Sequence, residues 1–316
     1  MFKEIAFPSY NGRDTVKGWI YAPIRKPLGI VQLVHGLGEH SRRYLHLILR
    51  LNEAGFVVAA DDHVGHGKTA MDSGIWGDYG DKGFLTTIED EKSLYDITVK
   101  DYPGLPCILF GHSWGSMISR GFAASYGGLI KGLVICGTCG VMGTMAPVAK
   151  DLKALIDAGK GGERDAAYLG RMFAGWTDRY ENPSGPNDWI SRDPDVVADH
   201  ASDPFNNLYS PSTNQANYDL ACLVEFITGT GWAEKVPRDL PVYNIAGDQD
   251  PVGNYGEGVY QVSNWLAETG HSRVYTKLYS GYRHEIHNNR DIREEVENRI
   301  AAFAQNVAWG LSEPPC

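Results

Sequence analysis

Short apolar segments alternate with helical or polar stretches along most of this 316-residue chain. Four of these segments, residues 29–34, 56–60, 107–110 and 131–136, are largely apolar from end to end. Runs of this length are typical of strands that are buried on both faces of a sheet. Strand–helix–strand repetition with short connections predicts a parallel sheet with helices on both faces. We therefore expect an α/β fold.

The alternation is interrupted over residues 138–237. This segment contains several aromatic residues and Gly- and Pro-rich loops but no clear buried strand, so we expect a largely helical insertion. The alternation returns with predicted strands at residues 240–246 and 273–279 and ends in an amphipathic helix. We therefore divide the chain into one discontinuous core, residues 1–137 and 238–316, and an inserted helical cap or lid, residues 138–237.

The strongest local motif is Gly111-His112-Ser113-Trp114-Gly115, which lies directly between a predicted strand and a predicted helix. This is G-x-S-x-G in the context of a nucleophile elbow. The turn is so sharp that Ser113 must adopt a strained backbone conformation, and small neighbours let the chain pass. The strain leaves the hydroxyl exposed, and Ser113 is therefore the candidate nucleophile.

A serine nucleophile needs a base and an orienting carboxylate. In this architecture both follow later in the chain, the acid before the histidine, each just after a strand. The loop after residues 240–246 offers Asp248 and Asp250, and the loop after residues 273–279 offers His284 and His287. Position alone leaves both choices open.

Backbone amides must also stabilise the oxyanion that develops on the substrate. One such amide follows the nucleophile, the N–H of Trp114. The other should come from the glycine-rich loop His35-Gly36-Leu37-Gly38, where we select the N–H of Leu37.

Charge and cysteine content argue against several classes of function. The chain has 29 Lys and Arg against 39 Asp and Glu, a formal charge of −10. Basic residues come at most in pairs, so we expect no nucleic-acid partner. No segment approaches the roughly 20 apolar residues of a membrane span, and the N-terminus does not read as a signal peptide. An odd number of cysteines, five, does not make a disulfide framework, and a cytoplasmic location is expected.

A single C-x-x-C pair, Cys136 and Cys139, lacks the second pair of a zinc site, so both are expected to be structural cysteines. No metal and no organic cofactor is expected.

Taken together, these motifs resemble the α/β-hydrolase superfamily, and within it the monoacylglycerol lipase and lysophospholipase-like group, which is also classed with S33-type serine aminopeptidases. The resemblance is carried by the segments 35–44, 62–67, 111–115, 247–252 and 283–286. It implies a mostly parallel sheet of about eight strands with an inserted helical lid.

The resemblance also selects among the open alternatives. The family's acid ends a G-x-x-D pattern, which matches Asp250, and its base opens a His-Glu pair, which matches His284. Two positions depart from the family, which often has Met and Gly where this chain has Trp114 and Ser116. Only the Trp114 backbone serves the oxyanion, so catalysis should survive, while the bulky indole could narrow the pocket.

The expected reaction is hydrolysis of a carboxylic ester through an acyl-enzyme, with Ser113, His284 and Asp250 as the triad. By resemblance, the substrate is an acyl-bearing small molecule of the monoacylglycerol or lysophospholipid type. Candidate substrate-binding residues in the lid are Phe173, Trp176 and Trp232. The lid could also make transient contact with a lipid surface. The oligomeric state is not predicted.

Three alternatives stay open. The first is an esterase or thioesterase for small substrates, with the same triad and a different pocket. The second is an aminopeptidase, which needs an acidic pair in the lid to hold a free amine, and Glu225 and Glu234 are the candidates for it. The third is a protein of this fold that binds a ligand without turnover, which loss of a triad member would favour.

Overall fold

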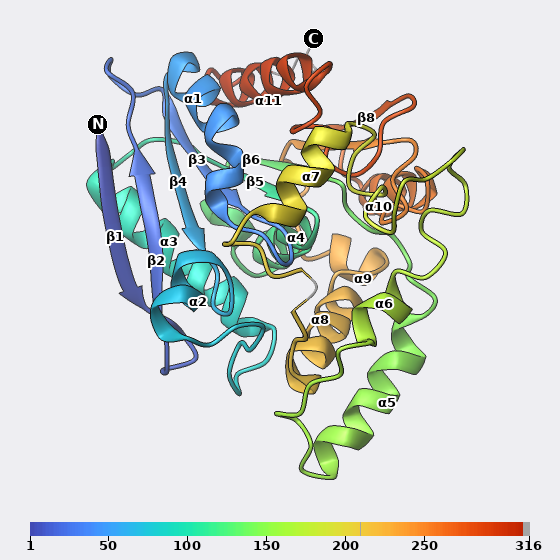
Figure 1. The fold of residues 1–316 in the computed structure, drawn as a ribbon. Coiled ribbons are helices and arrows are strands. Elements are labelled where there is room, and N and C mark those ends of the chain that lie inside the picture. Colours follow the sequence, from blue (N-terminus) through green and yellow to red (C-terminus); the bar gives the residue numbers. More distant parts are fainter. Residues whose placement is uncertain (209, 312–316) are drawn as a thin grey trace.

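The computed structural model describes residues 1–208 and 210–311. Its centre is an eight-stranded sheet in the order β1-β2-β4-β3-β5-β6-β7-β8. Figure 1 shows β1 and β2 at the edge of the molecule where the chain begins. The strands are β1 (Phe2–Pro8), β2 (Thr15–Tyr21), β3 (Gly29–Val34), β4 (Phe56–Asp62), β5 (Cys107–His112), β6 (Gly132–Cys136), β7 (Val242–Gly247) and β8 (Val274–Tyr279). β2 is antiparallel to both β1 and β4, and the pairs from β4 to β8 are parallel. The predicted mostly parallel α/β sheet is confirmed.

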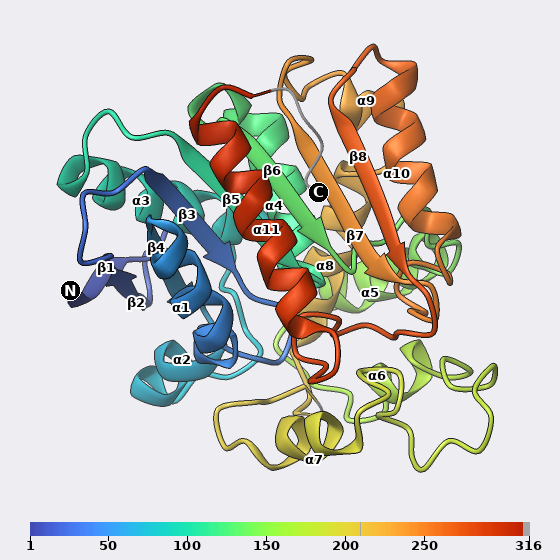
Figure 2. The same ribbon diagram turned by 90° about the horizontal axis from the view of Figure 1, so that it is seen from above.

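Helices cover both faces of the sheet (Figure 2). α1 (Leu45–Ala54), after the short 3-10 helix η1 (Ser41–Tyr44), lies on one face with α11 (Arg293–Ala308). The opposite face is covered by α3 (Leu85–Asp101), α4 (Trp114–Tyr126) and α10 (Glu257–Glu268). Two short helices, α2 (Gly67–Ser73) and the 3-10 turn η2 (Gly127–Leu129), complete the core.

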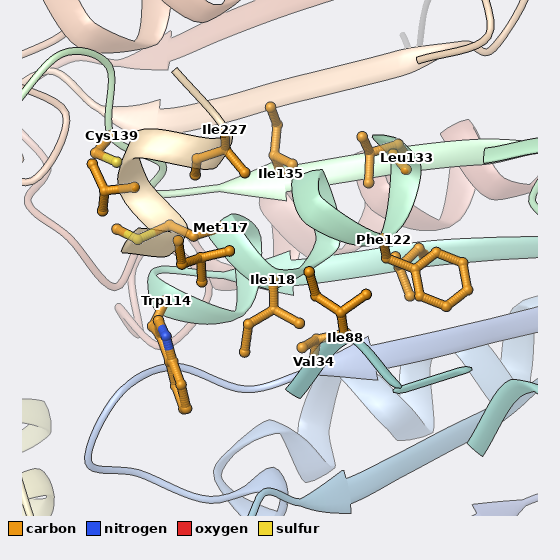
Figure 3. Packing of buried hydrophobic residues seen from close by; sticks show 14 of the residues in the cluster. Val34, Ile88, Trp114, Met117, Ile118, Phe122, Leu133, Ile135, Cys139 and Ile227 are labelled. Atoms are coloured by element: carbon orange, nitrogen blue, oxygen red, sulfur yellow. The ribbon is translucent and has the colours of Figure 1, made fainter. Parts of the chain in front are cut away.

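Alternate residues of the same strand serve the two faces. On β3, Ile30 and Val34 belong to the cluster under α3 and α4, whereas Val31 and Leu33 belong to the cluster under α1 and α11. Figure 3 shows the first cluster, in which side chains of α4 lie close to those of β3 and β6. Because both faces are buried, the strands read as continuous apolar runs in the sequence.

In the described part of the insertion, five helices lie between β6 and β7. They are α5 (Met145–Asp157), α6 (Tyr168–Met172), α7 (Pro194–Ser202), α8 (Asn214–Phe226) and α9 (Thr230–Ala233). Long irregular segments join them, notably residues 173–193, so the insertion is less helical than expected. Gly175, Pro183, Gly185 and Pro186 interrupt helical periodicity there.

Apolar side chains of the insertion belong to the main core cluster. Trp189, Leu223 and Trp232 join the same cluster as the strand and α4 residues. Within the described ranges, no helix is long and apolar enough to cross a membrane.

Candidate active site

Ser113 occupies the turn between β5 and α4 with φ 54° and ψ −123°, outside the regions that non-glycine residues favour. The flanking residues Gly111 and Gly115 must be glycines, because a larger side chain at either position would clash with the backbone. A Cβ on Gly111 would lie 2.3 Å from the carbonyl oxygen of Gly115, and one on Gly115 would lie 2.1 Å from that of Val34. The strained elbow expected from the sequence is therefore present.

Asp250 and His284 meet after β7 and β8. His284 Nδ1 donates to Asp250 Oδ2 at 2.8 Å, and both side chains are buried. The His284 ring lies 4.6 Å from that of His112, the residue before Ser113, measured between ring centroids. Burial disfavours the charged imidazolium, but the charge and hydrogen bond of Asp250 outweigh it, so the pKa of His284 is raised.

The two alternative residues have other partners. Asp248 Oδ1 accepts the Gly281 N–H at 2.7 Å and so caps the β8 loop. His287 is stacked on Tyr44, with 4.8 Å between ring centroids, and burial lowers its pKa well below the ordinary value. The geometry therefore joins Asp250 to His284 and leaves Asp248 and His287 outside the pair.

The loop that carries Leu37 lies beside the elbow, and Leu37, Ser113 and Trp114 all line one cavity. Because α4 begins at Trp114, the Trp114 N–H has no acceptor within the helix. A Cβ on Gly36 would come within 3.1 Å of the Ser113 Cβ, which shows how closely the loop approaches. Leu37 and Trp114 thus both lie near Ser113.

A buried ionic network supports this loop, and sequence reasoning missed it. Gly36 N–H donates to Glu39 Oε1 at 2.7 Å, and Arg43 donates to Glu39 Oε2 at 2.8 Å and to Glu285 Oε1 at 2.6 Å. Burial opposes ionisation of Glu285, but the positive charge of Arg43 outweighs burial and lowers the pKa of Glu285. The network therefore connects the Leu37 loop with Glu285, the neighbour of His284. No local sequence motif indicates that Arg43 pairs with Glu285, because the two residues are 242 positions apart.

The insertion is fixed to the same loops. His284 N–H donates to the Trp189 carbonyl at 3.3 Å, and Glu285 N–H donates to that of Ile190 at 2.7 Å. On the other side, a Cβ on Gly38 would lie 2.3 Å from Leu208 Cα, so only glycine fits there. These segments of the insertion are part of the wall of the site.

The cavity at Ser113 encloses about 480 Å³ including its open mouth. Apart from Ser113, the described residues that line it are apolar, and four of them are methionines: Met117, Met142, Met145 and Met172. Phe173 and Trp176, two of the predicted substrate-binding residues, line it with Trp189. The Trp114 indole forms part of the wall and stacks on Tyr79, with 5.2 Å between centroids.

The third predicted substrate-binding residue, Trp232, lies elsewhere. It is buried, does not line the cavity, and donates from its indole N–H to the Arg120 carbonyl at 2.9 Å. Its aromatic side chain serves the core beneath α4. Glu225 and Glu234, the guessed amine-binding pair, are exposed and do not line the cavity either.

Two buried groups of side chains in the described part of the chain could hold a metal ion. Asp61, His63 and Glu91 form one, and His112, Cys136 and His287 form the other, each with ligand atoms within 4.8 Å of one another. Cys136, expected to be structural, is thus a buried thiol beside two histidines. Neither group includes Ser113, Asp250 or His284.

The sheet order, the strained elbow and the acid–histidine pair together define an α/β hydrolase. A family model described as serine aminopeptidase, S33, matches residues 25–291. The chain is 29% identical over 279 residues to the monoacylglycerol lipase of Mycolicibacterium smegmatis, with 85% of each chain covered. Because the family model matches most of the chain, the protein belongs to the serine aminopeptidase S33 family, and its resemblance to the monoacylglycerol lipase group is confirmed.

Solved structures agree with this assignment. A highly thermostable carboxyl esterase from Bacillus coagulans, solved in complex with glycerol, is 60% identical with a TM-score of 0.95, covering 97% of this chain and 99% of that chain. A lipase solved in an open form is 40% identical with a TM-score of 0.90, covering 98% and 99%.

Proposed function

We propose that this protein is a serine esterase that hydrolyses acyl esters of the monoacylglycerol or lysophospholipid type. The observation that carries the proposal is the opening of Ser113 into a cavity whose other described lining is apolar, and the hydrogen-bonded His284–Asp250 pair supplies a base and its acid. The relatives named as a monoacylglycerol lipase and a carboxyl esterase support ester hydrolysis.

In the proposed reaction, Ser113 Oγ attacks the ester carbonyl while His284 takes the hydroxyl proton. The Asp250 bond engages Nδ1, so Nε2 is the nitrogen that serves Ser113. The collapsing intermediate expels the alcohol, which leaves with the proton from His284. Water then attacks the acyl-enzyme by the same route and releases the fatty acid.

The amides of Leu37 and Trp114 donate to the oxyanion in both steps. These amides stabilise the oxyanion strongly only if they are held in position before the negative charge develops. The Gly36–Glu39 hydrogen bond and the helical start at Trp114 supply that rigidity. The acyl chain lies among the methionines and aromatic residues, which are suited to an apolar, flexible ligand.

The family description leaves aminopeptidase activity as the alternative. A peptide substrate with a free amine needs an acidic partner in the pocket, and the described lining of the cavity contains no Asp or Glu. This favours an uncharged acyl group over an amine.

The test is hydrolysis of monoacylglycerols of rising chain length, lysophosphatidylcholine, p-nitrophenyl acetate and proline p-nitroanilide, with Ser113→Ala beside the wild type. We expect turnover of the monoacylglycerols or lysophosphatidylcholine that disappears in the variant. Turnover of acetate alone would indicate a small-ester enzyme. Cleavage of the anilide alone would indicate a peptidase, and wild-type inactivity on every substrate would contradict the proposal.

Two further points belong to the proposal. A cytoplasmic location is supported by the five cysteines, an odd number that does not suit a disulfide framework. Transient contact of the insertion with a lipid surface would deliver the substrate, and Val141, at 55% exposed, is an apolar side chain of the insertion available for it.

A further inference from the structure

A second hollow lies between α5 and α6, next to the cavity at Ser113. This outer groove encloses about 860 Å³ including its open mouth. Met145 and Met172 line both the cavity and the groove. These two side chains therefore form the wall that the two spaces share.

One face of α5 supplies an apolar side to the groove. Met145, Val148, Leu152 and Leu155 follow one another at intervals of three, four and three residues and all line it. This is the spacing of a single helix face. With a rise of about 1.5 Å per residue, the stripe is about 15 Å long, and it starts at the wall of the catalytic cavity.

The opposite side is formed by α6, where Tyr168 and Met172 line the groove. Three charged residues line the groove, Asp151, Asp165 and Arg171, and Arg171 forms an ion pair with Asp165 at 2.5 Å. That pair lies largely in solvent, with the side chains 62% and 42% exposed. The groove thus offers an apolar stripe beside an edge with two carboxylates and one guanidinium, which suits a hydrocarbon ligand rather than an anion.

Methionine is well suited to a wall that must open. Its side chain is unbranched and has three rotatable bonds, so it can change shape without movement of the backbone. Met145 is buried and Met172 is half-buried. Met172 packs against both the main core cluster and a small separate cluster formed by Leu152, Tyr168 and Leu169. Rotation of these side chains would join the two spaces.

We propose that the outer groove binds the distal part of a long acyl chain whose ester carbonyl lies at Ser113, and that Met145 and Met172 are the gate through which the chain passes. The occupant follows from continuity, because the groove begins where the acyl cavity ends. The inference rests on the proposed esterase function and adds a chain-length subsite to it.

The test places a polar residue at two distances from the gate along α5. Val148, close to the gate, is changed in Val148→Gln, and Leu155, 38% exposed and at the far end of the stripe, is changed in Leu155→Gln. kcat/KM is measured for p-nitrophenyl esters of increasing chain length, each below its critical micelle concentration. Leu49→Gln, on α1 and 61% exposed, is the matched control.

On acetate, which does not reach the gate, we expect wild-type values for Val148→Gln, Leu155→Gln and Leu49→Gln. Val148→Gln should fall below the wild type from a shorter chain length onward than Leu155→Gln does. The loss should be about fourfold for each methylene that loses its apolar contact. Met172→Phe, which narrows the gate, should act from the shortest length of the three, and Leu49→Gln should match the wild type throughout.

An equal loss on acetate and on long chains, a common onset for Val148→Gln and Leu155→Gln, or no loss at any length would each overturn the groove proposal while ester hydrolysis stands. Absence of wild-type turnover on every ester would overturn the proposed function and the groove with it. Leu155→Gln keeps the test decisive if Val148→Gln fails to fold, because a half-exposed position tolerates the change.

Discussion

At the scale of single residues, the candidate site depends on one strained backbone and one buried charge. Ser113 is held at φ 54° by the strand before it and the helix after it, and the close packing of Gly115 against Val34 leaves no relaxed alternative. Strain of this kind persists only where the surroundings determine it. Asp250 acts differently, through the negative charge of its own carboxylate beside the His284 ring.

The pH dependence of activity should report that charge. His284 must be neutral to accept the Ser113 proton, so activity falls as the pH drops through its pKa. Because Asp250 raises that pKa above the ordinary 6.5, the acid limb of kcat/KM should have its midpoint above pH 6.5. Asp250→Asn should move the limb to lower pH and reduce the rate by on the order of 10³–10⁴.

Asp248→Asn is the matched control, because Asp248 lies in the same loop and only caps the β8 turn. It should leave the midpoint and the rate close to those of the wild type. If Asp248→Asn rather than Asp250→Asn shifts the limb, the assignment of the acid is wrong.

At the scale of elements, Arg43 joins parts of the chain that are far apart in sequence. It comes from η1, is buried, and connects the Leu37 loop through Glu39 with the His284 loop through Glu285. Arg43→Met would leave two buried carboxylates without their cation. We expect a loss of about 3–5 kcal/mol in the free energy of unfolding, measured by urea denaturation.

Arg50→Met provides the comparison, since the Arg50–Glu53 pair on α1 is exposed and its atoms are 3.5 Å apart. Exposed pairs contribute about 0–1 kcal/mol. A cost for Arg43→Met no larger than that for Arg50→Met would contradict the supporting role of the network.

Local patterns in the sequence predicted the strands well and the insertion less well. The run at residues 29–34 matches β3, because burial on both faces leaves an unambiguous apolar signal. Trp232 was expected to bind substrate, but aromatic character does not distinguish a core position from a cavity wall. The Arg43 network was missed for a related reason, since a charged residue looks like a surface residue until its distant partners are placed.

At the scale of the whole molecule, the insertion behaves in this structure as part of the core rather than as a detachable lid. Trp232 packs with Arg120 of α4, and Trp189 and Ile190 hold the His284 loop.

Activity and far-UV circular dichroism should therefore be lost in one coincident urea transition. Trp232→Ala should lower the free energy of unfolding obtained from both signals by about 3–5 kcal/mol. Trp309→Ala, at a residue that is 56% exposed, should lower it by less than about 0.5 kcal/mol. Loss of activity at a lower urea concentration than the loss of helicity would show instead that the insertion unfolds first, and that its contacts with the His284 loop do not tie it to the core.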